Sequence, residues 1–301
     1  MQYRRLGKTE LNVSVIGLGT WQFGGEWGKE FTQAEVNAIF DAARANGINL
    51  VDTAECYGDH LSEKLVGEAI KQDRENWVVA TKFGHLFTGF NERDWALSPE
   101  AVQQQLEDSL KALQTDVIDL YQFHSGSNEQ FANDALWTML AKQKQSGKIR
   151  FLGVSISSSK EETNAYQTER ATQVGASVIQ VVYNLLQRKP EDAVFPLCAK
   201  QDLGVLARVP LASGLLSGKY KVGVQFPAND IRATQDDVQL QKMMEEVERI
   251  QQTEVPVGVP MATWALAWCL KHPIVASVIP GCKTLEQVRQ NAAAADLVGS
   301  F

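Results

Sequence analysis

Four polar residues lie at or just beyond the ends of three short apolar segments: Asp52, Tyr57, Lys82 and His124. The segments, which their apolar pattern predicts to be β-strands, span residues 49–51, 77–81 and 117–121. If these strands are consecutive and parallel, their carboxyl ends are neighbours, and a carboxylate, a phenol, an ammonium and an imidazole converge there. Such a set can deliver a proton to a carbonyl oxygen near neutral pH.

The rest of the chain shows the alternation of strands and helices that this convergence requires. Eight strand candidates begin near residues 15, 49, 77, 117, 149, 177, 204 and 275. The first seven follow at intervals of about 30 residues, the length of a strand plus a returning helix. Candidates such as Val178–Val182 are apolar on both faces, which is typical of a parallel sheet covered by helices.

Helix start signals recur between these strands. Thr32–Glu35, Ser159–Glu162 and Thr284–Gln287 are predicted capping boxes, and Ser98 precedes a proline at a first helical position. Eight strand–helix units in about 300 residues predict a closed (β/α)8 TIM barrel, with residues 1–301 as a single domain. An open doubly wound sheet is rejected because the first strand lacks the third glycine of the phosphate fingerprint.

Two segments interrupt the alternation. Residues 2–14 precede the first barrel strand and predict a β-hairpin that plugs the bottom of the barrel. About 70 residues separate strands seven and eight, with a glycine-rich stretch at 212–219 and predicted helices at 236–252 and 260–272. Long insertions at the carboxyl face of a barrel usually shape the substrate pocket.

Composition narrows the classes of function. The chain is 44% hydrophobic and 22% charged, with a net charge of -7 and no basic block, so nucleic acid is not an expected partner. No apolar stretch approaches the roughly 20 residues that span a bilayer, and residues 1–5 do not begin an apolar signal segment. Four widely spaced cysteines predict reduced thiols and a cytoplasmic location. The sequence is compatible with a homo-oligomer and does not fix the oligomeric state.

Seven motifs resemble those of the aldo-keto reductases, of the bacterial type whose branch includes potassium-channel β subunits. In order along the chain, they are Gly17–Trp21, Asp52–Gly58, Thr81–Lys82, Gln122–His124, Leu152–Ser155, Gly214–Lys219 and Ile279–Gly281. The resemblance implies the barrel argued above and reduction of aldehydes and ketones, the small-molecule substrates, by NAD(P)H. It makes Tyr57 the acid, with Lys82 lowering the pKa of the phenol from its usual value of about 10. Asp52 then holds Lys82, and His124 orients the carbonyl. No metal is required, because the nicotinamide supplies the hydride.

The resemblance also assigns residues to the cofactor. They are Thr20, Trp21, Ser155, Gln180, Arg208, Pro210, Leu211, Ser213, Gly214, Lys219, Gly281, Lys283, Gln287 and Asn291. Gln180 and Ser155 are expected to hold the nicotinamide carboxamide, and the segment from Pro210 to Lys219 to hold the pyrophosphate. Lys283 favours NADPH over NADH because its charge suits a 2′-phosphate.

Two positions depart from the family pattern. Ile156 follows Ser155 where the family usually has asparagine, and Arg208 stands where it often has an aromatic ring. We hypothesise that the charge of Arg208 disfavours NADP+ relative to NADPH. These departures also keep open an alternative function, that of an NADPH-binding regulatory or sensor subunit with slow turnover.

Aromatic residues gather after strands one and three. Trp21, Phe23, Phe83 and Phe87 are predicted to form an apolar wall for the substrate, with packing over the barrel rim as the alternative. Cys56, next to Tyr57, is interpreted as a buried inert thiol rather than a redox switch.

Overall fold

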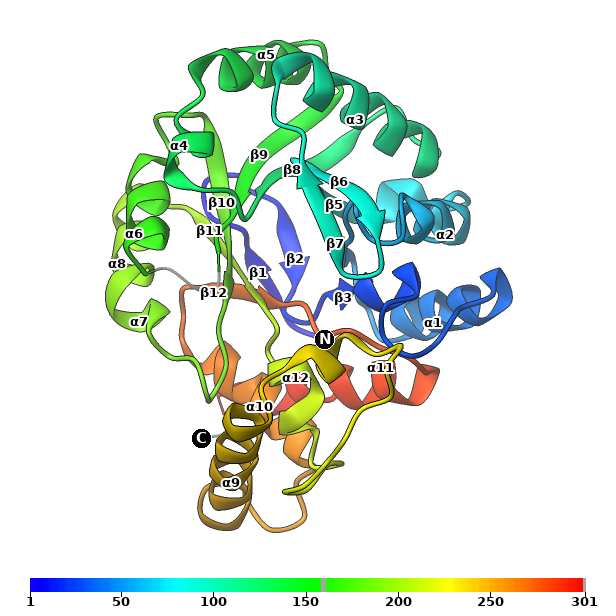
Figure 1. Cartoon of the computed structure of the whole chain (residues 1–301), viewed down its shortest axis with the longest axis vertical. Helices are drawn as coiled ribbons and strands as arrows, with labels where there is room; N and C mark the ends of the chain where they lie inside the picture. Colours follow the sequence, from blue (N-terminus) through cyan, green and yellow to red (C-terminus); the bar gives the residue numbers. More distant parts are fainter. Residues whose placement is uncertain (158–160, 300–301) are drawn as a thin grey trace.

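Eight parallel strands form a ring in the computed structural model, which describes residues 1–157 and 161–299 (Figure 1). The strands pair in chain order: β3 (Leu18–Gly19), β4 (Leu50–Asp52), β5 (Val78–Phe83), β8 (Ile118–His124), β9 (Ile149–Ser155), β10 (Ala176–Val182), β11 (Gly204–Arg208) and β12 (Val275–Val278). Parallel bridges Ile16–Val278 and Gly19–Gly281 join the first strand to the last. The predicted TIM barrel is therefore confirmed.

The N-terminal hairpin fills the bottom of this barrel, as predicted. Strand β1 (Tyr3–Arg5) pairs antiparallel with β2 (Asn12–Ser14). Leu6, Leu11 and Val13 of this segment belong to one apolar cluster with barrel-strand residues such as Leu120 and Leu206. The hairpin thus closes one end of the barrel and leaves the carboxyl end for a site.

Helices surround the ring of strands, and a larger apolar cluster lies between the two layers (Figure 1). They are α1 (Gln33–Ala45), α2 (Leu61–Ile70), α3 (Pro99–Ala112), α4 (Asn128–Phe131), α5 (Asp134–Gln145), α6 (Glu161–Arg170), α7 (Pro190–Ala193), α8 (Phe195–Gln201), α10 (Met261–Lys271), α11 (Leu285–Ala292) and α12 (Ala294–Leu297). Thr32 forms the predicted capping box, and Ser98 caps α3. The box predicted at 159–162 lies outside the described residues.

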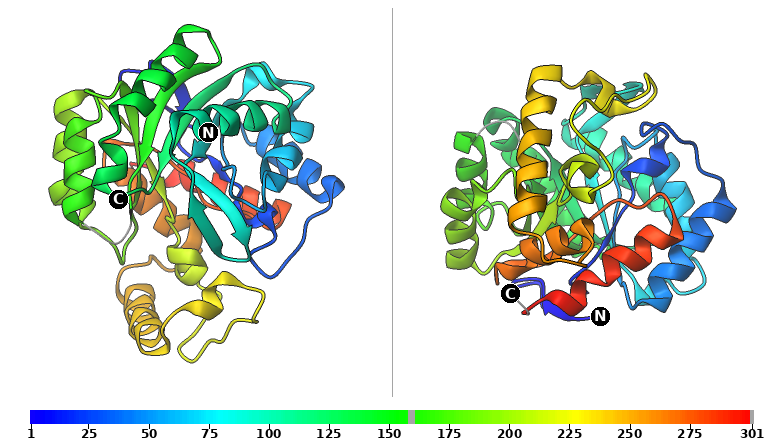
Figure 2. Two further views of the ribbon diagram at one scale, coloured as in Figure 1. Left: turned by 45° about the horizontal axis from the view of Figure 1, so that its top comes forward. Right: turned by 90° about the horizontal axis from the view of Figure 1, so that it is seen from below.

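The insertion between the last two strands adds α9 (Asp237–Thr253), which lies outside the ring next to α10 (Figures 1 and 2). Its buried face, which includes Leu240 and Met244, packs with Trp264 of α10 and with Leu215. Leu215 belongs to a 3-10 segment, η3 (Ala212–Ser217), and a second such turn, η4 (Ile231–Thr234), follows. The predicted extra helix is confirmed, and it supports the loop that lies at the mouth of the barrel.

A second hairpin was not predicted from the sequence. Strands β6 (His85–Gly89) and β7 (Glu92–Trp95) pair antiparallel after β5 and turn at Asn91, whose φ is 56°. Side chains on β6 alternate between half-buried and exposed, but Leu86 lies on the exposed face and His85 on the half-buried face, so the apolar pattern of the sequence does not show this period. The aromatic residues around Phe87 are also typical of a pocket wall, which is how they were interpreted from the sequence.

Across residues 1–157 and 161–299, no helix combines the length and apolar content that a bilayer-spanning segment requires.

Candidate active site

The structure brings the four predicted catalytic residues together at the carboxyl ends of β4, β5 and β8. The Lys82 ammonium donates to Asp52 Oδ1 at 2.7 Å, to the Thr53 carbonyl oxygen at 2.6 Å and to the Tyr57 phenol oxygen at 3.4 Å. Lys82 is 1% exposed, so its charge is held by these partners and not by water. The His124 and Tyr57 rings meet edge to face, with centroids 6.3 Å apart.

Two buried amides orient the other oxygen of Asp52. Gln180 donates to Asp52 Oδ2 at 2.7 Å, and Gln122 donates to the same atom at 3.1 Å. Ser155 donates to Gln180 Oε1 at 3.3 Å and is fully buried behind it. The Ser155 hydroxyl reaches Gln180 and Ser155 does not line the cavity, so its contact with the cofactor stays a prediction. Gln122 was missed, although an amide inside an apolar strand is the signal that identified Gln180.

A close backbone contact fixes the turn that carries Tyr57. A Cβ atom on Gly58 would lie 2.6 Å from the Gly24 carbonyl oxygen, so only glycine allows this approach. The Trp21 ring stacks on the Tyr57 ring, with centroids 5.7 Å apart and planes at 17°. Backbone and ring contacts together hold the phenol beside Lys82.

The electrostatic environment keeps the Tyr57 phenol protonated. Burial raises the pKa of Tyr57 to about 12, and the opposing effect of the Lys82 charge is smaller. The expectation of a net lowered pKa is therefore wrong, although Lys82 does act in the predicted direction. Tyr57 accordingly holds its proton throughout the neutral range.

His124 is a neutral imidazole in this environment. Burial, followed by the charges of His85 and Lys82, holds the pKa of His124 well below its usual value. Cys56 Sγ lies 3.7 Å from His124 Nδ1, and burial raises the pKa of the Cys56 thiol well above its usual value. A protonated thiol can donate to Nδ1, which leaves the ring proton of His124 on Nε2.

A cavity of about 580 Å³ opens at this end of the barrel, and Asp52, Tyr57 and His124 line it. All predicted cofactor residues except Ser155 line it as well: Thr20, Trp21, Gln180, Arg208, Pro210, Leu211, Ser213, Gly214, Lys219, Gly281, Lys283, Gln287 and Asn291. Its size suits a small-molecule ligand.

The loop after β11 turns tightly beside the cavity. Ser213 and Gly214 have φ values of 57° and 91°, and the Gly214 backbone N–H donates to the Leu211 carbonyl oxygen at 2.9 Å. Arg208, at the end of β11, donates through Nη2 to the Ile156 carbonyl oxygen at 3.0 Å. Its Nε is buried with no hydrogen-bond partner among the described residues, so one donor remains available to a ligand.

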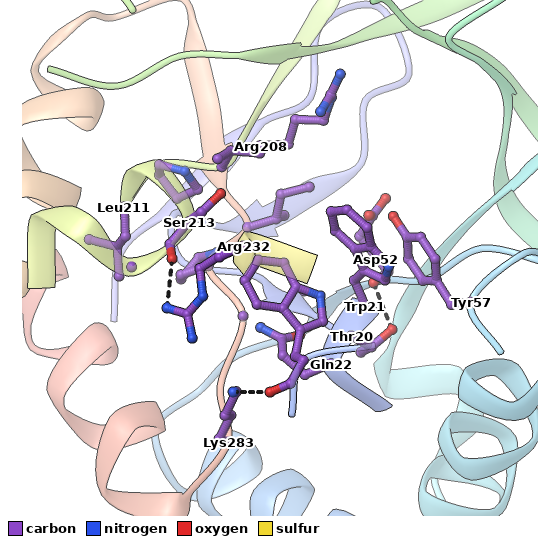
Figure 3. Close-up of a pocket in the computed structure, with 18 of the residues that line it drawn as sticks. Thr20, Trp21, Gln22, Asp52, Tyr57, Arg208, Leu211, Ser213, Arg232 and Lys283 are labelled. Carbon is purple, nitrogen blue, oxygen red and sulfur yellow. Dashed lines mark hydrogen bonds between the residues drawn. The ribbon is translucent and has the colours of Figure 1, made fainter. Parts of the chain in front are cut away.

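A cluster of cations lies on the side of the cavity away from Tyr57 and Asp52 (Figure 3). Arg232 pairs with Asp230 at 2.6 Å and donates to the Ser213 carbonyl oxygen at 3.2 Å. Lys283 donates to the Trp27 carbonyl oxygen and lies 4.0 Å from Asp230 Oδ2. Burial and the charge of Arg232 lower the pKa of Lys283. Lys219 also lines the cavity, while Asp230 lies within 4.0 Å of Arg232 and Lys283. Arg232 was missed, because a lone arginine in a long loop gives no signal in the sequence.

One buried carboxylate, Glu26, joins three segments around the cavity. It accepts from Arg93 Nη2 at 2.6 and 2.7 Å, from Trp21 Nε1 at 2.8 Å and from the Asn91 backbone N–H at 2.8 Å. Its own carbonyl oxygen accepts from the Ile231 backbone N–H at 3.0 Å. Hairpin β6–β7, which supplies His85, Asn91 and Arg93 to the cavity lining, is thereby fixed to the loop after β3.

The predicted aromatic wall is only partly present. Trp21 lines the cavity, but Phe23 and Phe83 are fully buried in the core between strands and helices. Phe87 does not line the cavity either, and the Arg93 guanidinium lies 4.8 Å from its ring centroid. Packing therefore explains all three side chains: Phe23 and Phe83 pack in the core, and Phe87 packs against Arg93 within hairpin β6–β7.

Comparisons with known proteins agree with this arrangement. The sequence model of the Aldo/keto reductase family matches residues 15–300. A protein of Escherichia coli (strain K12) named NADH-specific methylglyoxal reductase is 33% identical over 311 residues, 97% of this chain and 93% of that protein. An Arabidopsis thaliana protein named "Probable voltage-gated potassium channel subunit beta" is 29% identical over 99% of this chain and 92% of its own. The structure of an aldo-keto reductase from Bacillus halodurans in its holo form has a TM-score of 0.82 and 30% identity, covering 98% of this chain and 91% of that chain.

Proposed function

Because the chain belongs to the aldo-keto reductase family of nicotinamide-dependent oxidoreductases, we propose that it reduces aldehydes and ketones with NADPH, using Tyr57 as the proton donor. The observation that carries the proposal is the contact between Lys82 and the Tyr57 phenol oxygen at 3.4 Å. Because Lys82 donates to this oxygen, the phenolic O–H remains free to donate into the cavity.

Each of the four residues has a role when a carbonyl group is reduced. A bound reduced nicotinamide supplies the hydride. Negative charge then develops on the carbonyl oxygen, and Tyr57 transfers its proton to that oxygen. Lys82 stabilises the phenolate that remains, and Asp52 balances the charge of Lys82. His124, neutral and protonated on Nε2, donates a hydrogen bond that orients the carbonyl.

The pKa of Tyr57 gives the reaction a direction-dependent response to pH. With a pKa of about 12, the phenol carries its proton at neutral pH, so the donor is ready for reduction. Oxidation of an alcohol requires the phenolate instead, and it is favoured as the pH rises towards that value. This supports carbonyl reduction as the working direction near neutrality.

The choice of NADPH rests on the cationic side of the cavity. Lys219, Arg232 and Lys283 line the cavity, and Asp230, beside Arg232 and Lys283, balances only one charge, which leaves an excess of positive charge that suits a 2′-phosphate. Ser213 and Gly214 also line the cavity, and they remain the proposed place for the pyrophosphate. The relative from Escherichia coli is named NADH-specific, so the choice between NADH and NADPH differs within the family. For this chain, the preference must be tested by changing its own cationic residues.

The reducing cytoplasm is the proposed location. Its support is that all four cysteines, Cys56, Cys198, Cys269 and Cys282, are free and buried.

Steady-state oxidation of NADPH with a panel of aldehydes and ketones tests the proposal. We expect turnover that falls at least 100-fold in Tyr57→Phe, while the Kd of NADPH, measured by fluorescence, changes less than about threefold. The alternative is a nucleotide-binding regulatory subunit, supported by similarity to the Arabidopsis thaliana protein. Tight NADPH binding without turnover on any carbonyl in the panel would favour that alternative.

A further inference from the structure

Catalytic His124 and two neighbouring side chains form a cluster of three different metal-ligating groups. One ligand atom from each of Glu55, Cys56 and His124 lies within 4.8 Å of the other two. Cys56 Sγ and His124 Nδ1 are 3.7 Å apart. Zinc bonds of about 2.3 Å to sulfur and 2.0–2.1 Å to nitrogen place such atoms about 3.5 Å apart in a tetrahedral site.

The Glu55 carboxylate provides a second, independent indication of a ligand. Glu55 is 3% exposed, and its Oε1 accepts from the His85 backbone N–H at 3.0 Å. Its Oε2 is buried and has no hydrogen-bond partner within the described part of the chain. A buried carboxylate oxygen without a partner is costly, and a cation beside it removes that cost.

The local charges allow a divalent cation. A thiolate from Cys56 and a carboxylate from Glu55 together neutralise a dication. Arg93 lies near Cys56 and would repel the ion, but its charge is paired with buried Glu26 at 2.6 Å. The nearby Lys82 is likewise paired with Asp52 at 2.7 Å.

The chemistry of the donors selects the metal. One sulfur, one imidazole nitrogen and one carboxylate oxygen suit Zn²⁺ and not Mg²⁺ or Ca²⁺, which prefer oxygen ligands alone. Cys56 and His124 line the cavity, so an ion can enter through it. Three protein ligands leave a fourth position for water.

We propose that Glu55, Cys56 and His124 form an inhibitory Zn²⁺ site. Binding releases the thiol proton of Cys56 to solvent. Cys56 Sγ and His124 Nδ1, 3.7 Å apart, are already close to the spacing of about 3.5 Å in a zinc site, so the ion would hold the imidazole rigidly through Nδ1. A His124 ring fixed by the metal cannot adjust to the carbonyl oxygen, and a misplacement of about 1 Å costs about 100-fold in rate. The inhibition, unlike the binding, rests on the proposed reductase function.

Cobalt titration tests the site without reference to activity. Co²⁺ added to the protein should give a thiolate-to-cobalt charge-transfer band, which disappears in Cys56→Ser. Cys198→Ser is the matched control, since Cys198 is also buried and does not line the cavity. The band should persist there. Glu55→Gln keeps the acceptor for the His85 N–H and should weaken Co²⁺ binding at least tenfold.

Zinc inhibition is then measured against each variant's own metal-free rate. We expect micromolar Zn²⁺ to reduce the wild-type rate, EDTA to restore it, and the inhibition constant to rise at least tenfold in Cys56→Ser but not in Cys198→Ser. Absence of the band in the wild-type protein, or its persistence in Cys56→Ser, overturns the site. A band without inhibition in an enzyme that turns over overturns the inhibitory role. A band in a protein without turnover supports the site and contradicts only the proposed function.

Discussion

Replacement of Lys82 by methionine should slow the hydride-transfer step by roughly 30- to 1,000-fold. Methionine keeps the length of the buried side chain and removes the charge. At the observed 3.4 Å between Lys82 Nζ and the Tyr57 oxygen, and with an effective dielectric constant of about 20, the ammonium stabilises the phenolate by about 5 kcal/mol. That energy corresponds to a shift of roughly 3 to 4 units in the pKa of Tyr57. If the transition state feels half to all of a pKa shift of about 3 units, the rate falls by roughly 30- to 1,000-fold. This range agrees with the usual contribution of general acid catalysis, about 10²–10⁴-fold.

The assay is single-turnover stopped-flow with preformed enzyme–NADPH complex and a reactive aldehyde. The Kd of NADPH should change less than about threefold, because Lys82 does not line the cavity. Because Lys82 acts through the phenol, Lys82→Met should have little further effect in a Tyr57→Phe background. An equal slowing in both backgrounds would refute the assigned role of Lys82. So would a rate within threefold of wild type in Lys82→Met.

Three further perturbations probe the cofactor and the fold. Lys283→Met should raise the Kd of NADPH roughly 10- to 100-fold and leave that of NADH nearly unchanged, because hydrogen bonds to charged groups contribute about 1.5–3 kcal/mol; fluorescence titration measures both. Arg208→Tyr should narrow the ratio of the Kd values of NADP+ and NADPH, and an unchanged ratio excludes the charge effect. Burial lowers the pKa of His60, but its hydrogen bond to buried Glu63 outweighs this and the pKa is raised overall. The stability from this pair is therefore present below about pH 6.5 and is lost as the pH rises through the raised pKa. His60→Gln should then lower the free energy of unfolding by about 1–2 kcal/mol at pH 6 and by less at pH 9, measured by urea denaturation.

The barrel could be predicted because its signals are local and repeated. Apolar runs such as Val178–Val182 carry the strand signal, and capping residues such as Thr32 carry the helix signal. Hairpin β6–β7 was missed because aromatic residues around Phe87 resembled a pocket wall as much as a strand. Adjacent apolar residues Leu86 and Phe87 lie on opposite faces of β6, so no alternating apolar pattern identified the strand.

In the candidate site, the positions of residues at strand ends were also easier to predict than those of residues on loops. Asp52, Lys82 and His124 are placed by neighbouring strands, so their convergence follows from topology. Arg232 reaches the cavity only through the path of a long loop, which no periodicity encodes. The direction of the pKa shift of Tyr57 was not predicted correctly either. The pKa depends on how deeply the phenol is buried as well as on the charge of Lys82.

The buried contact between Glu26 and Arg93 has an evolutionary consequence. Loss of either partner leaves an unpaired buried charge, which costs about 3–5 kcal/mol. Hairpin β6–β7 can therefore change its exposed positions freely, but positions 26 and 93 should vary together among homologous sequences. A lineage that replaces this hairpin should also carry an uncharged residue in place of Glu26. Covariation of positions 26 and 93 would then distinguish relatives in which hairpin β6–β7 forms this cavity wall from relatives in which another segment forms it.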